Sequence, residues 1–172
     1  WKAEAFRYVR CVVVQRPFTR KPNRLSAPVY EQRYVCSLTL VTAGRISAFA
    51  SADWVVHCLD VLRGSAVEHR IAVLAYCFMP DHVHLLVHNT GTASVVRFVK
   101  DFKQFTGYRY KRTAGATLWQ KSYHDHFLRN HEDVMSVAKY IFANPVRAGI
   151  VGTAAEYPFS GSLAWGRAVV EA

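Results

Sequence analysis

Residues Tyr76–Val87 read YCFMPDHVHLLV, and this stretch decides the architecture at the centre of the protein. It joins a nearly continuous apolar run, Arg70–Phe78, to a second strand-like segment, His82–His88, through a short connection at residues 79–81. Two such segments around a short turn predict a hairpin of antiparallel strands. Because the first strand is apolar almost throughout, we expect it to be a covered, central strand.

His82 and His84 lie two residues apart on the second strand of this hairpin. Side chains alternate along a strand, so both imidazoles point to one face, as does His88, while Val83 points to the opposite layer. Two neighbouring imidazoles can share a divalent metal ion, although a complete site needs a third ligand. The pattern alone also fits two ordinary histidines without a ligand, so both interpretations stay open.

Upstream of the hairpin, the pattern predicts one strand and one helix. Tyr34–Val41 is rich in residues that favour strands. Ser51 or Asp53 can cap the helix that follows. We expect that helix to run through Leu62 and to end at Gly64.

Downstream of the hairpin, residues 92–112 have a helical pattern with an apolar face that consists of Val95, Val96, Val99, Phe102 and Phe105. Residues 118–128 are expected to be extended. Asn130 can cap a last helix, which runs to about Ala143 because Pro145 stops it. The order strand, helix, hairpin, helix, strand, helix predicts an α+β fold, with helices packed on one face of a mainly antiparallel sheet.

The size and composition of the chain suit one domain with its own core. It has 172 residues, of which 51% are hydrophobic. We expect a single domain over residues 1–172, with a basic, irregular lead-in at 1–32 and a tail at 161–172. The longest strongly apolar run, residues 71–79, is far too short for a membrane helix, so no membrane partner is expected. The four cysteines form no C-x-x-C pair, which argues against a zinc ribbon. With no signal peptide visible, we expect reduced thiols in the cytoplasm.

Positive charge points to a polyanionic partner. Lys and Arg number 22 against 12 acidic residues, a formal net charge of +10, which favours nucleic acid ahead of an acidic membrane. Basic residues gather on the polar face of the 92–112 helix, and we expect phosphate contacts from Lys100, Lys103, Arg109, Lys111 and Arg112. Aromatic residues between them can stack on unpaired bases, although several are expected to face the core.

Two further groups of residues could carry chemistry. Tyr140 and Asn144 are one turn apart on the last helix, beside its apolar stripe, so the Tyr140 hydroxyl can reach a cleft. Tyrosine is a weak nucleophile because its pKa is near 10, and a metal that polarises a phosphate would help it attack. Tyr140 alone also fits an amphipathic side chain at the edge of the core. His124 and His126 share a face if their segment is extended, and we favour a DNA-contacting or supporting role for them over metal ligation.

Each of these signals is weak alone, but their order and spacing resemble a known family. FMPDHVHLLV at residues 78–87 resembles the hallmark of the single-tyrosine HUH transposases, and YIFANPVRAG at residues 140–149 resembles one branch of that family. LWQ at residues 118–120 and YHDHFLRN at residues 123–130 are similar to the branch called REP-associated tyrosine transposases. The resemblance covers roughly residues 34–160.

The resemblance implies a ferredoxin-like fold with both histidines on a central strand. It implies that His82 and His84 bind Mg²⁺ or Mn²⁺, that Tyr140 is the nucleophile, and that Asn144 stands where simpler relatives have a glutamine as third metal ligand. The implied substrate is single-stranded DNA that bears hairpins from repetitive extragenic palindromes. Cleavage would leave a 5′-phosphotyrosine and a free 3′-OH without ATP. Besides the five basic residues of the 92–112 helix, His126 and Arg147 are expected DNA contacts.

Two alternatives are open. A domesticated relative would bind DNA hairpins without cleaving them, and a metal-dependent phosphodiesterase would use an activated water and not need Tyr140. The resemblance fits either a monomer, with the tyrosine acting in its own chain, or a homodimer, with the tyrosine acting in the partner. It implies a bacterial protein that acts at the nucleoid.

Overall fold

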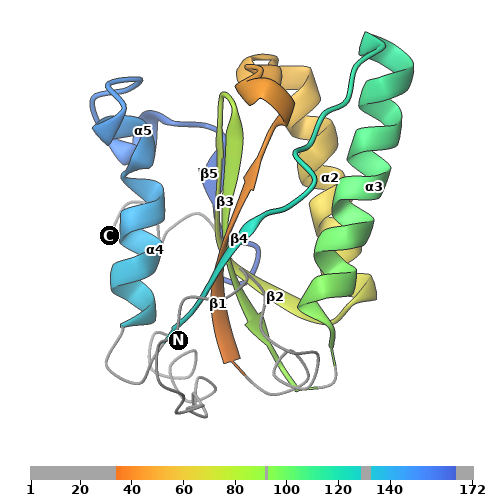
Figure 1. Ribbon diagram of the computed structural model, residues 1–172. Coiled ribbons are helices and arrows are strands. Elements are labelled where there is room, and N and C mark those ends of the chain that lie inside the picture. Colours follow the sequence, from red (N-terminus) through yellow and green to blue (C-terminus); the bar gives the residue numbers. More distant parts are fainter. Residues whose placement is uncertain (1–33, 92, 129–132, 166–172) are drawn as a thin grey trace, which may run out of the picture.

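In the described part of the chain, five strands form one antiparallel sheet in the order β4-β1-β3-β2-β5 (Figure 1). The strands are β1 (Tyr34–Val41), β2 (Ile71–Met79), β3 (His82–Asn89), β4 (His124–Phe127) and β5 (Ser160–Gly161). The structure is a computed structural model that describes residues 34–91, 93–128 and 133–165. The expected lead-in at 1–32, the Asn130 cap and the end of the expected tail, residues 166–172, lie outside the described residues.

Helices separate the strands along the chain, except between β2 and β3. They are α2 (Ala52–Glu68), α3 (Val95–Ala114), α4 (Val134–Phe142) and the short α5 (Asn144–Arg147), with 3₁₀ turns at η3 (Ala43–Arg45), η4 (Ala48–Ala50) and η5 (Ala154–Glu156). The unit β1-α2-β2-β3-α3-β4 has the strand order 4-1-3-2 of a ferredoxin-like fold, to which β5 adds an edge strand. None of the described helices is both long enough and apolar enough to cross a membrane. The α+β prediction, with the two histidines on a central strand, is confirmed.

Helices cover both faces of the sheet, which corrects the expectation of one covered face. The α2 and α3 helices of the ferredoxin-like unit pack on one face, where Val83, Leu85 and Val87 of β3 join the larger core. The α4 helix packs on the other face, to the left of the sheet in Figure 1. Its Ile141 lies in a second core with Leu86. The second face needs cover because β2 presents apolar side chains on both of its sides.

The ends of the helices follow local rules with two departures from expectation. Ser51 caps α2, since its hydroxyl accepts a hydrogen bond from the backbone N–H of Trp54 at 3.4 Å. The helix does not end at Gly64 but continues to Glu68. A glycine inside a helix costs only about 1 kcal/mol, and the next residue, Ser65, is buried. The second departure is at α4, which begins at Val134 and is capped by Asp133, three residues after the expected Asn130. The carboxylate of Asp133 accepts from two backbone N–H groups at 3.1 Å.

The segment expected to be extended over residues 118–128 forms a strand only at His124–Phe127. Before that strand, the chain lies along α3. The indole N–H of Trp119 donates to the buried hydroxyl of Thr106 at 2.8 Å, which ties the segment to the helix. Trp119 also forms an isolated bridge with Thr42 next to β1. Residues 118–123 are therefore held by contacts with α3, such as that of Trp119, and not by the strand pairing that the sequence pattern predicts.

The buried side chains of β3 should carry much of the stability. We expect Val87→Ala to lower the free energy of unfolding by about 2–3 kcal/mol, because Val87 is 0% exposed and its lost methyl groups leave a cavity. The matched control is Val67→Ala on α2, where Val67 is 81% exposed and the change should stay within about 0.5 kcal/mol. Urea denaturation followed by circular dichroism measures both. Equal losses in the two variants would contradict this packing.

Candidate metal and nucleophile site

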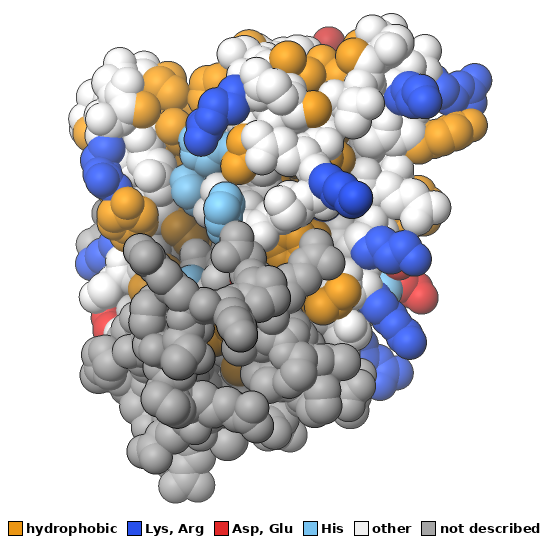
Figure 2. All heavy atoms as spheres, viewed as in Figure 1, with side chains coloured by type: hydrophobic (Ala, Val, Ile, Leu, Met, Phe, Trp, Pro, Cys, Tyr) orange, Lys and Arg blue, Asp and Glu red, His pale blue; other side chains and the backbone are white. Residues whose placement is uncertain are grey.

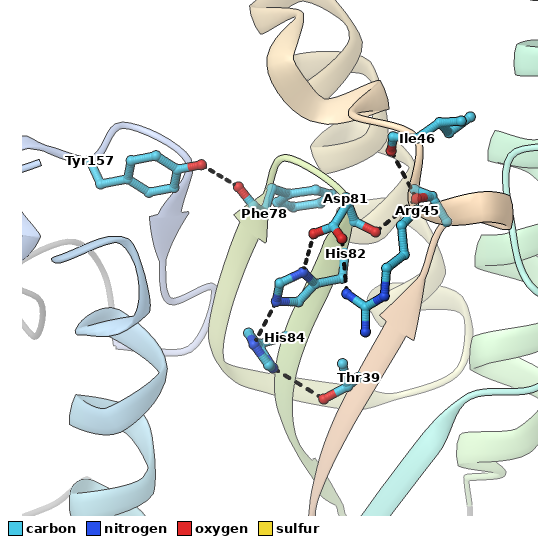
Figure 3. Close-up of polar contacts among 9 residues, drawn as sticks. Thr39, Arg45, Ile46, Phe78, Asp81, His82, His84 and Tyr157 are labelled. Carbon is cyan, nitrogen blue, oxygen red and sulfur yellow. Dashed lines mark hydrogen bonds and ion pairs between the residues drawn. The ribbon is translucent and has the colours of Figure 1, made fainter. Parts of the chain in front are cut away.

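His82 and His84 lie side by side on β3, with their rings turned toward each other (Figure 3). The Nε2 atoms are 3.0 Å apart, and the ring planes are nearly perpendicular. The two side chains are partly buried, and their strand is paired on both edges, with β1 and with β2. The alternation of side chains along β3 thus brings the two imidazoles together, as the sequence predicts.

The opposite nitrogen of each ring has its own partner, from residues that the sequence analysis did not single out. Asp81 lies at the turn, and its carboxylate is 2.6 Å from Nδ1 of His82. A carboxylate accepts, so this nitrogen carries the proton and donates. Nδ1 of His84 is 3.1 Å from the hydroxyl of Thr39 on β1, the residue directly opposite it in the sheet. If His84 likewise carries its proton on Nδ1 and donates it to Thr39, both Nε2 lone pairs face the same point.

Asp81 is itself held in place from two sides. Its second carboxylate oxygen is paired with Arg45 at 3.0 Å. The Thr42 hydroxyl and backbone N–H both lie within hydrogen-bonding distance of the Asp81 carbonyl, at 2.8 and 2.9 Å. Partial burial disfavours the charged carboxylate, but the hydrogen bond from His82 and the ion pair with Arg45 outweigh it and lower the pKa of Asp81. An ionised Asp81 therefore orients the His82 ring.

The electrostatics of the pair suit a cation. Burial, with the nearby His82 as a smaller cause, lowers the pKa of His84 to about 4, so His84 is neutral at neutral pH and keeps its lone pair. Neighbouring corners of an octahedron with metal–ligand distances of about 2.1 Å are about 3.0 Å apart. The 3.0 Å between the Nε2 atoms fits that spacing. Across the described residues, no third His, Cys, Asp or Glu completes a ligand group, so further ligands would be amide, water or substrate oxygens.

Tyr140 lies on α4, which packs against β2 and β3 on the face of the sheet that bears the two histidines. Ala138 and Ile141 turn into the core, whereas Tyr140 is 55% exposed, as its place beside the apolar stripe predicts. The guanidinium of Arg147 lies over the Tyr140 ring, 4.4 Å from its centroid. An exposed tyrosine thus stands on the histidine face.

Asn144 has a structural task at the junction of α4 and α5. Its amide nitrogen donates to the backbone carbonyls of Tyr140 at 3.1 Å and Ile141 at 3.2 Å. Among the described residues, no hydrogen bond joins Asn144 to the histidine pair. Its role as a metal ligand stays a prediction, and only its amide oxygen is left for such a role.

His124 and His126 share a face of β4, and both are exposed. In the register of the sheet, His124 pairs with Thr39, which in turn pairs with His84. The face of the sheet that bears the candidate site therefore continues outward to the β4 edge. Figure 2 shows histidine side chains gathered on this side of the molecule, between the α4 side and the α3 side. This position suits the expected DNA contact at His126.

The basic residues of α3 divide between two hollows. Lys100 and Lys111 line a groove of about 510 Å³ between α3 and residues 117–123, and Arg109 and Arg112 line a second hollow between α3 and α2. Lys and Arg side chains are seen along the α3 side of the molecule in Figure 2. The aromatic residues of α3 divide between core and surface: Phe98 and Phe102 are fully buried, whereas Tyr108 is exposed.

Phe105, expected in the apolar stripe of α3, is 60% exposed instead. Phe98 takes its place in the core, because the buried stripe of the helix runs through Val95, Phe98, Val99, Phe102 and Thr106. Position 106 faces the interior as a threonine, whose hydroxyl donates to the Phe102 carbonyl and accepts from Trp119. Because a threonine does not count as an apolar residue, the sequence pattern did not show that position 106 belongs to the buried face of the helix.

Lys103 differs from the other lysines of α3. Its ammonium donates to the carbonyl of Gln120 at 2.7 Å and lies within 3.4 Å of the carbonyls of Lys121 and Ser122. An ammonium has three donors, so these carbonyls can satisfy it fully. Lys103 therefore fixes the segment before β4, and this internal task competes with the phosphate contact that the sequence predicts.

Comparisons with known proteins identify the family of this chain. The family described as "Transposase IS200 like" matches residues 31–144. A Haemophilus influenzae protein described as a REP-associated tyrosine transposase is 25% identical over 71% of this chain and 76% of its own length. The REP-associated tyrosine transposase of Escherichia coli is 31% identical over 50% of this chain and 51% of its own length. The chain thus spans most of the first relative and about half of the second.

Solved structures share the fold. A REP-associated tyrosine transposase bound to a REP hairpin superposes with a TM-score of 0.65 at 20% identity, over 83% of this chain and 82% of that one. A transposase structure from Deinococcus radiodurans has a TM-score of 0.50 at 22% identity, over 66% and 88%. At these identities the likeness concerns the fold alone. The family match covers most of the chain and includes His82, His84 and Tyr140, and this protein belongs to the IS200-like transposase family.

Proposed function

We propose that this protein is a metal-dependent transposase that nicks and joins single-stranded DNA through Tyr140. One observation carries the proposal: the His82 and His84 Nε2 atoms face each other at 3.0 Å, on the sheet face that α4 covers with Tyr140 exposed. His82 and His84 would hold Mg²⁺ or Mn²⁺, with Asn144 or water among the remaining ligands. A bound cation would polarise the scissile phosphate and make its phosphorus more electrophilic.

The protein's own residues would carry the transfer. The Tyr140 oxygen forms a bond to phosphorus as its proton passes to solvent, and the bond from phosphorus to the 3′-oxygen breaks. The 3′-oxygen takes the electron pair and a proton and leaves as a hydroxyl. The 5′-phosphate stays on Tyr140 as a phosphodiester, so a second 3′-OH can reverse the step without ATP. Asp81 and Thr39 keep the histidine rings oriented throughout.

The proposed substrate is a single strand that bears a hairpin. A structure with the same fold is a REP-associated tyrosine transposase bound to a REP hairpin, and the relatives from Haemophilus influenzae and Escherichia coli are also described as REP-associated tyrosine transposases. The net charge of +10 and the basic residues of α3 suit a phosphate backbone. Arg109, Arg112, His126 and Arg147 are further proposed contacts.

Tyr140→Phe should abolish the covalent protein–DNA adduct while leaving hairpin affinity within about twofold, because only the attacking oxygen is removed. The measurement is denaturing gel electrophoresis with a hairpin oligonucleotide labelled at its 3′ end, in the presence of Mn²⁺. Tyr110→Phe is the matched control, since it removes the hydroxyl of a tyrosine on α3. An undiminished adduct in Tyr140→Phe would sink the nucleophile assignment. Turnover without any adduct would favour hydrolysis by water, and binding without cleavage would favour a domesticated binder.

His84→Ala should eliminate Mn²⁺ binding, because one imidazole cannot replace a pair. Asp81→Asn should weaken it by about 10–100-fold, because the amide orients the His82 ring less well than the carboxylate does. Isothermal titration with Mn²⁺ in the absence of DNA measures both. His57→Ala on α2 serves as the control that removes a histidine elsewhere. Wild-type Mn²⁺ affinity in His84→Ala would show that the histidine pair is not the site.

Lys111→Ala should reduce the dependence of hairpin affinity on salt by about one unit of log–log slope without a change in stability, as expected for one lost phosphate contact. Lys103→Met should instead lower the free energy of unfolding by about 1–3 kcal/mol, because backbone carbonyls lose their donor. Binding titrations across a salt series and urea denaturation separate the two effects. If Lys103→Met keeps its stability but reduces the salt dependence of hairpin affinity, Lys103 is a DNA contact and not a structural residue.

A further inference from the structure

The Arg147 side chain stacks on the candidate nucleophile. Its guanidinium carbon is 4.4 Å from the centroid of the Tyr140 ring, within the range of a cation–π contact. The two residues belong to different helices, α4 and α5, and are seven positions apart, about two helical turns. A second pair of this kind, Arg112 with Tyr108 on α3, is looser at 5.7 Å.

The junction between the helices keeps Arg147 above Tyr140. The backbone N–H of Arg147 donates to the carbonyl of Ala143 at 2.9 Å, so the helical path continues across the junction. The Asn144 amide binds the carbonyls of Tyr140 and Ile141, and Pro145 is buried. The segment Asn144–Arg147 is therefore anchored to the end of α4 instead of swinging freely.

The guanidinium N–H groups of Arg147 remain available for a ligand. Within the described part of the chain, no carboxylate forms an ion pair with Arg147. A guanidinium is planar, with five N–H groups that point outward in its plane. Stacking on a ring uses the face of that plane and leaves the edge for a bidentate contact with phosphate. Lysine has neither a planar group to stack on the ring nor a bidentate edge for phosphate.

We propose that Arg147 positions the reaction: its face holds the Tyr140 ring, and its edge holds the scissile phosphate, so that the phenol oxygen and the phosphorus approach each other. This inference rests on the proposed function of Tyr140. Arg147 then contributes mainly to the rate of bond formation on bound DNA and less to DNA affinity. Misplacement of reacting groups by about 1 Å can cost about 100-fold in rate, which sets the expected size of the effect.

The test is the single-turnover rate of adduct formation at saturating hairpin DNA with Mn²⁺, beside the hairpin dissociation constant, for the full chain and its variants. Arg147→Lys should keep the affinity within about threefold but slow the rate at saturation at least about tenfold, because charge remains while stacking and the bidentate edge are lost. Arg147→Ala should slow it about 100-fold. Arg63→Gln, which removes an exposed arginine of α2 that is paired with Asp60, should change neither quantity.

The outcomes distinguish the positioning role of Arg147 from the proposed function of Tyr140. No adduct with the wild-type chain overturns the proposed function, and the inference with it. A wild-type adduct together with an unchanged saturated rate in Arg147→Lys overturns the inference alone. The inference also fails if Arg147→Ala weakens affinity but reaches the wild-type rate at saturation, which would make Arg147 a simple phosphate contact. Equal thermal melting of all variants excludes misfolding as the cause of a slow rate.

Discussion

The pairing of β3 on both of its edges is the constraint on which the candidate site depends. β1 and β2 bind the strand along its whole length, and Val83, Leu85 and Val87 are completely buried on the α2–α3 side. A shift of one residue would move these three side chains to the α4 side of the sheet and push the histidines into the core on the α2–α3 side. The same register sets Thr39 opposite His84. Hydrophobic burial on one face thus determines the position of the polar site on the other.

The sequence predicted the elements well where one pattern dominates and poorly where tertiary contacts decide. The β1 boundaries and the β2–β3 hairpin follow from β-favouring runs around a short turn. The bulge after Val73, which puts both Leu74 and Ala75 into the second core, is invisible in an apolar run because either phase of alternation looks alike. The second covered face was missed for the same reason, since a strand that is apolar on both sides does not show which helix covers it.

The candidate site divides in a similar way. Periodicity placed His82 and His84 on one face and Tyr140 beside a core stripe, and the family motifs joined them into one hypothesis. The oriented rings depend on Asp81 and Thr39, which sequence reasoning missed. Asp81 directly precedes His82 in the sequence, but aspartate is common in turns, so its position did not indicate a role in the site. Thr39 gave no local signal, because it meets His84 only through sheet register. The carbonyl contacts of Lys103 likewise depend on a segment whose course no periodicity reveals.

The tight β2–β3 turn has a consequence for the order in which the site assembles during folding. Asp81, His82 and His84 lie within four consecutive positions and share one hairpin, so their contacts form as soon as that local structure closes. The α4 helix reaches the same face only after a much longer stretch of chain has been organised, at a greater cost in loop-closure entropy. The histidine half of the candidate site is therefore local in sequence, and the tyrosine half is long-range. Early contacts can bring the two imidazoles together before Tyr140 has docked on the same face.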